Sequence, residues 1–453
     1  MVLRRRPSLA VGLALVLVAA AGCAGSPVAV RGTGGAASAA VPTGLVSATL
    51  IVPGELAADP FDQPRQVLVP PGWTMSLWAR LPGARLAAWT PDGALLVSLP
   101  GAGQVVRLVP GGSAGAAATV LLDGLDQPHG LAFDGDTLYV AESDQVDAYR
   151  YAQGTATDRW PVAAGLPDAK SADLGGAYAH ALKSVAVGPD RAVYLSIGST
   201  DNISEEDRAA DPERASILRV PPGGGPPTVF ARGVRNGTGL AIAPDGSVWT
   251  AVNNRDNIQY PYDRPYGDAS GSSLGDVIQD YVNDHPVEEL ARLTPGRDLG
   301  WPFCNPDPDV EPGVAGTAYR FTAPKFVVDV QTNPNGAELD CASLTPIEQT
   351  FGAHSAPLGM STVTDGLPAP YTEGALVGIH GSWNRMPPQP PEVSFFPWAG
   401  GTFGPQRTLV GGFQVADGSR WGRPVAAVQG PDRAVYITDD SAGAVYRLAP
   451  PGV

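Results

Sequence analysis

The 453-residue chain is poor in charged residues, in histidine and in cysteine. Only 17% of its residues are charged, and 30 Lys and Arg stand against 45 Asp and Glu, for a net charge of −15. Because no basic cluster follows the first residues, we expect no nucleic-acid partner and no electrostatic docking to anionic lipid. No G-x-G-x-x-G motif follows a predicted strand, so a Rossmann site for nicotinamide or flavin is not supported.

The first of only three cysteines, Cys23, follows a basic segment and a short apolar run. The run covers residues 9–21 and is too short to span a bilayer. The small residues just before Cys23 resemble the lipobox of bacterial lipoproteins, although Ala20 stands where leucine is usual. A plain secretory signal is the alternative, and either signal exports the protein. We predict a signal peptide over residues 1–22 and a lipid anchor at Cys23 on the extracytoplasmic face of the cell membrane.

The other two cysteines, Cys304 and Cys341, have neither C-x-x-C nor Cys/His zinc spacing. If Cys23 carries lipid, they are an even pair in an oxidising compartment, and a disulfide between them is the default. Residues 23–60 are rich in Gly, Ala, Ser, Pro and Val and show no periodicity. They predict a flexible tether ahead of a single domain over residues 61–453.

Turn residues and strand formers are abundant, with 56 Gly, 46 Pro and 43% hydrophobic residues. A unit recurs in which a short apolar strand, a turn such as Pro-Asp-Gly and an alternating strand follow one another. Its six copies lie near residues 86–108, 130–140, 177–220, 239–250, 375–396 and 424–448. The repeat predicts an all-β fold, a six-bladed β-propeller, in which residues 67–81 supply a strand that closes the ring. A β-sandwich is the alternative, but it does not need six similar turns.

The longest gap between copies, about residues 255–358, is interpreted as a loop-rich insertion that the disulfide constrains. Within it, residues 305–311 place oxygen atoms at alternate positions, as a calcium loop does, but an exposed acidic loop is the favoured interpretation.

Loops at one end of a propeller channel bring together residues that are distant in sequence, so the function must be argued from those loops. His180 is the first candidate, because a loop histidine can accept a proton from a substrate hydroxyl. Arg235 offers a planar fork of donors for a carboxylate, and Asn236 both donates and accepts. A structural role is the alternative for each residue. Further cations in comparable loops are Lys183, Arg420 and Arg423.

Several stretches, taken in order, resemble the glucose/sorbosone dehydrogenase family, and most closely its sorbosone dehydrogenase branch. Members of this family are six-bladed propellers that use pyrroloquinoline quinone (PQQ) and calcium. The resemblance runs from about residue 66 to the C-terminus. It rests on His180 eight residues before Gly188-Pro189-Asp190, on Val234-Arg235-Asn236, on Val252-Asn253-Asn254-Arg255-Asp256, on Gly300-Trp301-Pro302, and on residues 353–359 and 378–385.

The resemblance implies a role for each of these loops. His180 would be the general base that removes the hydroxyl proton while hydride passes to the quinone. Backbone carbonyls near Arg255 and Asp256 would hold calcium. The quinone carries three carboxylates, which arginines are suited to clamp. His380 and Arg385 stand in the region where the family has a cofactor-binding lysine. The residues assigned to cofactor binding are therefore Arg235, Asn236, Arg423, Arg420, Lys183, His380 and Arg385.

We therefore predict an exported oxidoreductase that oxidises a sugar, or a similar alcohol or aldehyde hydrate, and passes the electrons to an acceptor that the sequence does not identify. Two alternatives stay open. One is a calcium-dependent lactonase or other hydrolase on a propeller, which would act without quinone. The other is a catalytically silent propeller that binds sugar or protein.

Overall fold

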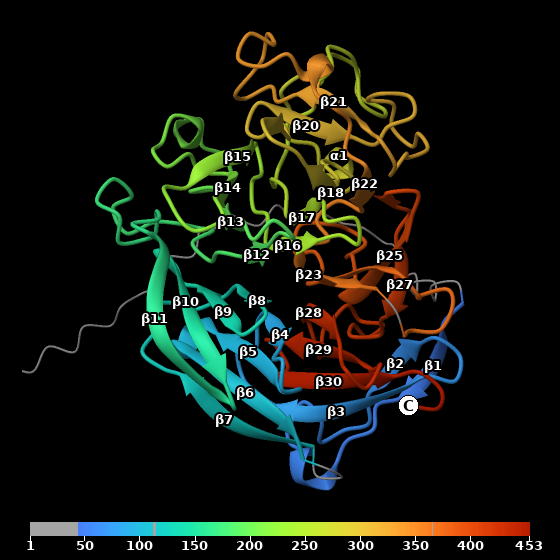
Figure 1. Ribbon diagram of the computed structural model, residues 1–453. Coiled ribbons are helices and arrows are strands. Elements are labelled where there is room, and N and C mark those ends of the chain that lie inside the picture. The colour runs from blue at the N-terminus through green and yellow to red at the C-terminus, as the bar shows by residue number, and fades with distance from the viewer. Residues whose placement is uncertain (1–43, 112–114, 365) are drawn as a thin grey trace, which may run out of the picture. The chain divides into compact units, whose positions relative to one another are not determined.

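The computed structural model describes residues 44–111, 115–364 and 366–453, so the predicted signal peptide and Cys23 lie outside the described residues. Six antiparallel sheets follow one another around a central axis (Figure 1). This arrangement confirms the all-β, six-bladed propeller. In the described residues, no helix is long and apolar enough to cross a membrane.

The strands run through the blades in chain order. Blades 1 and 2 contain β4 (Ala87–Trp89), β5 (Leu95–Leu99), β6 (Gln104–Pro110), β7 (Ala116–Leu122), β8 (Leu131–Asp134), β9 (Thr137–Ala141), β10 (Gln145–Ala152) and β11 (Thr155–Ala164). Blades 3 and 4 contain β12 (Val185–Val187), β13 (Val193–Ile197), β14 (Ser216–Val220), β15 (Thr228–Arg232), β16 (Gly239–Ile242), β17 (Val248–Val252), β18 (Glu288–Leu293) and β22 (Gln349–Phe351), with β19 (Arg297–Asp298) beside β15. Blades 5 and 6 contain β23 (Pro357–Val363), β24 (Gly374–Ile379), β25 (Glu392–Ala399), β26 (Thr402–Phe403), β27 (Arg407–Val410), β28 (Pro424–Gln429), β29 (Val435–Asp439), β30 (Ala444–Ala449) and β3 (Thr74–Arg80).

The ring closes through β3, which comes from the N-terminal side of all the other blade strands. It pairs antiparallel with β30, with Thr74 opposite Ala449 and Leu77 opposite Tyr446. Met75 and Leu77 are buried in the core of this last blade. The prediction that residues 67–81 close the ring is therefore confirmed, because β3 completes the last blade as its outermost strand.

The turn between β12 and β13 shows why the repeated motif forms a tight hairpin. The Gly188 amide donates to the Ala192 carbonyl at 2.9 Å. Arg191 takes a left-handed conformation with φ of 66°, and the Asp190 carboxylate accepts from the Ala192 amide at 3.1 Å. All 5 residues of β13, on both faces of the strand, are then buried between neighbouring blades. These hairpin turns lie at one end of the channel, so the segments leading into β4, β8, β12, β16, β23 and β28 lie at the other.

The core consists of apolar layers between adjacent blades. Trp249 of β17 is fully buried and meets Phe403 of β26 edge-to-face, with ring centroids 4.7 Å apart. Gly378 of β24 lies so close to β28 that a Cβ atom there would stand 2.2 Å from the Val425 carbonyl oxygen. Only glycine therefore allows blades 5 and 6 to pack this closely at that point.

Two blades differ from the sequence-based interpretation. The insertion was expected over the whole of residues 255–358, but β18 and β22 within it complete blade 4. The pair Glu288-Glu289 opens β18 and conceals its strand pattern, because buried carboxylates are rare in strands. In blade 5 the first strand is β23, ahead of the segment around β24 that was read as the start of this copy.

The remaining inserted residues form a separate layer beyond blade 4. They include α1 (Gln279–Val282) and a hairpin of β20 (Cys304–Asp307) with β21 (Lys325–Val328). The Cys304–Cys341 disulfide is confirmed, with Cα atoms 5.6 Å apart. Short 3₁₀ helices lie at η1 (Gly54–Leu56), η2 (Pro100–Ala102), η4 (Glu206–Arg208) and η5 (Cys341–Ser343). We use the term insertion below for residues 253–287 and 294–348.

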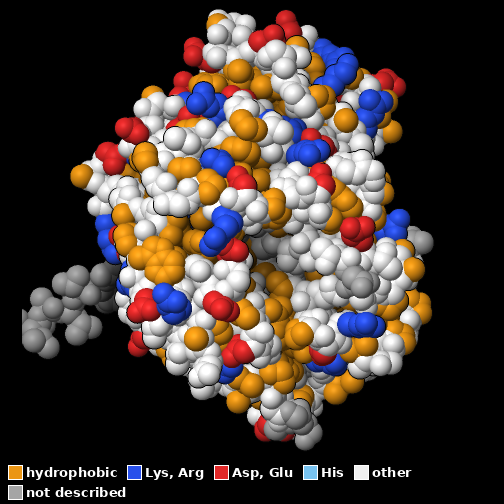
Figure 2. Space-filling view, in the orientation of Figure 1, with side chains coloured by type: hydrophobic (Ala, Val, Ile, Leu, Met, Phe, Trp, Pro, Cys, Tyr) orange, Lys and Arg blue, Asp and Glu red, His pale blue; other side chains and the backbone are white. Residues whose placement is uncertain are grey.

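Regular structure begins before residue 61, where the sequence places the start of the domain. β1 (Val46–Thr49) pairs antiparallel with β2 (Gln66–Val69). Leu50 is buried in the same core cluster as Val67 and Val69. Residues 46–60, which the sequence assigns to the tether, therefore pack on the propeller. On the face shown in Figure 2, acidic and basic side chains are interspersed without a continuous basic patch.

Candidate functional site

The segments that lead into the first strands of the blades are joined across blade boundaries by hydrogen bonds. The Gly130 amide donates to the Lys183 carbonyl at 2.9 Å, which joins blades 2 and 3. The Ser184 hydroxyl donates to the Thr238 carbonyl at 2.6 Å, which joins blades 3 and 4. First-strand residues such as Ala87, Leu131 and Val185 line the narrow channel below. We call the ring of residues just ahead of these strands the channel mouth.

His180 lies at the channel mouth, and its neighbours determine which ring nitrogen carries the hydrogen. Its Nδ1 lies 3.1 Å from the Ser199 carbonyl oxygen and 2.9 Å from the Ser199 hydroxyl oxygen. The carbonyl can only accept, and the hydroxyl gives its own proton to the Asp201 carbonyl at 2.7 Å. Nδ1 therefore carries the hydrogen, and the lone pair of the neutral ring is on Nε2.

The surroundings of His180 keep the ring neutral. Burial, and after it the positive charge of Arg235, lower the pKa of His180 to about 3. The side chain still has part of its surface exposed at the mouth. His180 is therefore a neutral, accessible proton acceptor at ordinary pH.

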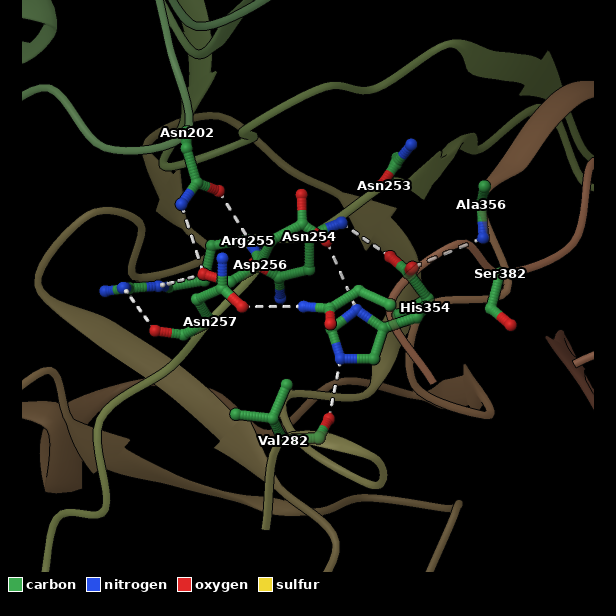
Figure 3. A network of polar contacts seen from close by, with 12 residues as sticks. Asn202, Asn253, Asn254, Arg255, Asp256, Asn257, Val282, His354, Ala356 and Ser382 are labelled. Carbon is green, nitrogen blue, oxygen red and sulfur yellow. Dashed lines mark hydrogen bonds and ion pairs between the residues drawn. The ribbon is translucent and has the colours of Figure 1, made fainter. Parts of the chain in front are cut away.

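Arg235 holds together the loops on the blade 4 side of the mouth. Its guanidinium donates to the Asn202 carbonyl at 3.2 Å, to the Asn202 side chain at 3.0 Å and to the Asn253 carbonyl at 3.0 Å. Asn202 in turn bonds both the amide and the carbonyl of Asp256, at 2.8 and 3.1 Å (Figure 3). Burial lowers the pKa of Arg235 to about 10, so the side chain remains a cation at neutral pH.

His354 links this network to α1. Its Nε2 lies 2.6 Å from the Val282 carbonyl oxygen, and its Nδ1 lies 3.4 Å from an Asp256 carboxylate oxygen (Figure 3). The Val282 carbonyl can only accept, so Nε2 carries the hydrogen of this bond. Burial acts to lower the pKa of His354, but the contact with Asp256 and the charge of Glu288 outweigh it and raise this pKa. His354 is held at both ring nitrogens beneath the Asp256 loop.

Glu288 forms hydrogen bonds to the loops around Asn254 and Ala356. Its carboxylate accepts from the Ala356 amide at 3.3 Å and from the Asn254 amide at 2.5 Å. Burial raises the pKa of Glu288 to about 7. The side chain ties the strand end after β17 to the segment before β23.

A second cluster of polar side chains at the mouth comes from blades 1, 5 and 6. The Asp440 carboxylate lies 2.8 Å from Arg85 NH1 and 2.8 Å from His380 Nε2, and Arg423 donates to the His380 carbonyl at 2.9 Å. Burial works to raise the pKa of Asp440, but the His380 bond and the charges of His380 and Arg85 lower it to about 2. Among the described residues, the terminal guanidinium nitrogens of Arg423 have no hydrogen-bond partner.

His129 lies beside this group on blade 2 and is fully buried. Its Nδ1 is 3.2 Å from the Lys183 carbonyl oxygen, while its Nε2 has no partner among the described residues. Burial, and then the charge of Arg85, lower the pKa of His129 to about 3. The buried Nε atom of Arg85 also lacks a partner there. The mouth thus has both unpaired donors and unpaired acceptors, as expected where a polar ligand binds.

The structure brings most of the sequence-predicted residues to the mouth, but four of the side chains are engaged elsewhere. Lys183 is fully buried and donates to the carbonyls of Pro167 and Ala181, both at 2.8 Å. Arg420 donates to Gln414 and to loop carbonyls. Arg385 pairs with Asp284 at 2.9 Å and Arg255 pairs with Asp329. These cations stabilise loops, and Arg255 has only its carbonyl to offer a metal ion.

Several residues of the mouth had no role in the sequence-based interpretation. Arg85 and His129 each lie two residues before the first strand of a blade, the same position as Lys183. Aligning the repeats on their first strands, instead of on their turns, would have identified these positions. Nothing local marks Asn202, Glu288 or Asp440, because their contacts depend on blades that are far apart in the sequence.

The expectation of an exposed acidic loop at residues 305–311 is wrong for Asp307 and Asp309, whereas Glu311 is exposed. The side chains of Asp307 and Asp309 are 5% and 1% exposed, and both face His285. Pairing with a buried histidine is what allows these carboxylates to be buried.

Comparisons with known proteins agree with this geometry. A family described as TrAA12-like matches residues 67–450. The chain is similar to the PQQ domain of pyranose dehydrogenase from Coprinopsis cinerea in its holo form, with 21% identity, a TM-score of 0.66 and coverage of 85% of this chain and 97% of that chain. It is also similar to a calcium structure of Carbohydrate-Active Enzymes Family AA12 from Trichoderma reesei, with 20% identity, a TM-score of 0.67 and coverage of 84% and 96%. At these identities the likeness shows the fold.

A curated relative with no assigned role also matches. It is an uncharacterised protein of Borreliella burgdorferi, 24% identical over 261 residues. The match spans 56% of this chain and 56% of that protein, little more than half the length of each. The TrAA12-like match is far longer, since it runs from β2 to the end of β30 and includes every blade. This chain belongs to the TrAA12-like family.

Proposed function

We propose that this protein is a sugar dehydrogenase that uses PQQ and calcium at the channel mouth, with His180 as the general base. The family and the fold shared with a pyranose dehydrogenase PQQ domain support the reaction class. The observation that carries the proposal is the Nε2 lone pair of His180. Two acceptors at Nδ1 and a lowered pKa leave this atom ready to take the proton of a substrate hydroxyl.

The polar groups of the mouth fit an anionic, planar ligand. Arg423 has terminal nitrogens without partners among the described residues, Arg85 has an unpaired Nε, and the Asn236 side-chain nitrogen has no described partner. Guanidinium groups bind carboxylates through paired hydrogen bonds. We assign cofactor contacts to Asn236, Arg423 and Arg85, with Arg235 and His380 holding the loops in position. When bound, PQQ accepts the hydride that leaves the substrate carbon.

The proposed calcium site lies in the loop after β17. The carboxylate of Asp256 and the carbonyl oxygens of this loop are the hard ligands that calcium prefers. Asn202 and Arg235 fix the path of the loop, and His354 Nδ1 lies 3.4 Å from one Asp256 oxygen. That contact leaves the other carboxylate oxygen of Asp256 for an ion. The carbonyl oxygen of Arg255 adds a further ligand from the same loop.

The test is reconstitution of the purified protein with PQQ and calcium. Binding is followed by quinone absorbance, and turnover by reduction of an artificial dye with a panel of aldoses and with sorbosone. We expect saturable quinone binding and dye reduction with at least one aldose, and much slower reduction with His180→Ala at unchanged quinone affinity. Absence of quinone binding and of dye reduction would refute the proposal. Hydrolysis of lactones without quinone would favour a hydrolase instead.

We also propose that the enzyme acts outside the cytoplasm, on a lipid anchor at Cys23. The basic segment, the apolar run and the small residues before Cys23 support this placement. The substrate class proposed is the aldoses, and preference for sorbosone is a narrower expectation from the sequence. Incorporation of labelled fatty acid that is lost in Cys23→Ser tests the anchor. Equal incorporation in both proteins would refute it.

A further inference from the structure

We propose that His285, Asp307 and Asp309 form a binding site for a divalent transition-metal ion, separate from the calcium proposed at the channel mouth. The three residues come from different segments of the insertion. His285 follows α1, Asp307 ends β20, and Asp309 lies in the loop after β20. Their nearest ligand atoms all lie within 4.8 Å of one another.

The spacing of the inner atoms suits a single ion. His285 Nε2 lies 3.0 Å from Asp309 Oδ1 and 3.5 Å from Asp307 Oδ1. Zinc binds imidazole nitrogen and carboxylate oxygen at about 2.0–2.2 Å. Two ligands of a tetrahedral or octahedral ion at such distances stand about 3.0–3.4 Å apart. Both histidine-to-carboxylate distances are close to this range, and the ligand atoms of the two aspartates lie within 4.8 Å of each other.

The outer atoms of the same groups are already held by the protein. His285 Nδ1 donates to the Tyr281 carbonyl at 2.8 Å. Asp307 Oδ2 accepts from the Tyr262 hydroxyl, and Asp309 Oδ2 accepts from the Gly313 amide at 2.7 Å. Metal-bound histidines and carboxylates have this arrangement, in which partners of the outer atoms orient the inner ones. Here they direct His285 Nε2 and both Oδ1 atoms toward a common point.

The net charge of the three side chains also favours binding of a divalent cation. Neither Asp307 nor Asp309 forms an ion pair with a lysine or arginine among the described residues. Two carboxylates with one imidazolium leave a net negative charge on side chains that are 5% exposed or less. A divalent ion with neutral His285 makes the group neutral, which lowers the cost of burying it.

An unpartnered buried hydroxyl is a second, independent observation. The Tyr281 ring stacks on the His285 ring with centroids 3.9 Å apart. Its hydroxyl is fully buried and has no hydrogen-bond partner among the described residues. A water molecule on the ion would accept the hydrogen bond that this hydroxyl otherwise lacks.

The ion would brace the segment that supports the channel mouth. In the same segment, the Val282 carbonyl oxygen lies 2.6 Å from His354 Nε2. The Asn283 side-chain oxygen accepts from the Met386 amide at 2.9 Å. An ion bound to His285 fixes the end of α1 to β20. The proposed role is therefore structural and does not depend on quinone or sugar.

The test uses the whole protein without PQQ, produced in medium supplemented with zinc or with cobalt. After dialysis against a chelator in excess calcium, we expect about one equivalent of transition metal per chain by elemental analysis. The cobalt protein should show the visible absorption of cobalt with nitrogen and oxygen ligands. His285→Gln and Asp309→Asn should each lower the retained metal at least tenfold.

Asp284→Asn is the matched control, because it makes the same chemical change one residue from His285 while its partners are Arg385 and the Tyr319 hydroxyl. It should retain the metal. Circular dichroism checks that each variant is folded, and the cobalt spectrum of the wild type needs no variant. A wild-type protein without bound metal would refute the proposal and leave a buried histidine–carboxylate ion pair only. Metal that survives both substitutions would also refute it, and neither result bears on sugar oxidation.

Discussion

The histidines of the channel mouth and those bound to the insertion differ in charge although all of them are largely buried. His129 and His180 each have a backbone carbonyl at Nδ1 and no carboxylate contact, and burial lowers the pKa of each to about 3. His285 has a carbonyl at one nitrogen and carboxylates at the other, which outweigh burial and raise its pKa to about 9. A carboxylate at the second nitrogen is not sufficient by itself, because His380 has one from Asp440 at 2.8 Å and burial still lowers its pKa.

This difference distinguishes histidines that can take up a proton from histidines that hold neighbouring groups in place. A neutral ring with a free Nε2 can take up a proton, whereas a ring with both nitrogens engaged can only hold other groups in place. His180 belongs to the first kind and His354 to the second. In the proposed reaction the propeller end would provide the reacting group, and the insertion would fix the loops around it.

Replacing the neutral base at the mouth should have the largest effect. We expect His180→Asn to lower dye-linked turnover by about 10²–10⁴-fold, because a positioned general base contributes that much. Steady-state rates of the PQQ-loaded protein measure it, with quinone affinity from absorbance titration. Arg191→Gln, at the opposite end of the channel, is the control and should keep the wild-type rate. A loss below about tenfold would assign the proton to another group.

Removing the disulfide tests whether the insertion is stabilised separately from the ring. Cys304 and Cys341 close a loop with a sequence separation of 37. The double change to serine should destabilise the insertion by about 2–4 kcal/mol. Hydrogen exchange should speed up in residues 294–348 and stay unchanged in blades 1, 2 and 6. Equal loss of protection in all blades would show that the two regions unfold together.

Acid should weaken the mouth through its neutral histidines. The pKa of His129 is about 3 in the folded protein and near 6.5 when unfolded, so between these values the unfolded chain binds more protons. Stability therefore falls as pH drops through this range, by about 2 kcal/mol at pH 5 for one such group. Glu288, with its pKa raised to about 7, changes stability in the opposite sense over the same range, so denaturant unfolding of the wild type alone at pH 7.5 and pH 5 does not measure the His129 contribution.

The contribution of His129 is isolated by comparison with His129→Gln, which cannot titrate. The variant should lose less stability than the wild type between the two pH values, by about 2 kcal/mol. An identical loss in both proteins would mean that His129 is protonated in the folded state. The absolute stability of the variant does not enter this comparison.

The fold could be predicted from the sequence because each blade carries its own local signal. Turns such as Gly188-Pro189-Asp190 and the strands beside them repeat, and the closing strand β3 has its own apolar pattern. Blade 4 was only half recognised, because its third strand begins with Glu288 and Glu289. Their burial depends on partners such as the Asn254 amide, which no local pattern reveals.

The site was predictable only in part, for a similar reason. His180, Arg235 and Asn236 belong to motifs with fixed spacing, and the structure places them at the channel mouth. The direction in which a cation points is set by tertiary contacts, so Lys183 could not be distinguished from a ligand-binding lysine until its carbonyl partners were known. The burial of Asp307 likewise depends on His285, which approaches it from another segment.

The smallest expected effect concerns the hydroxyl that helps to orient His180. Ser199→Ala removes one of the two acceptors at Nδ1 but leaves the Ser199 carbonyl at 3.1 Å, so the hydrogen stays on Nδ1 and Nε2 remains the base. Loss of one hydrogen bond of about 1 kcal/mol should slow turnover about fivefold. Ser199→Thr keeps the hydroxyl and should retain more of the rate. A loss as large as that of His180→Asn would mean that the hydroxyl takes part in proton transfer, since orientation by one of two acceptors cannot account for it.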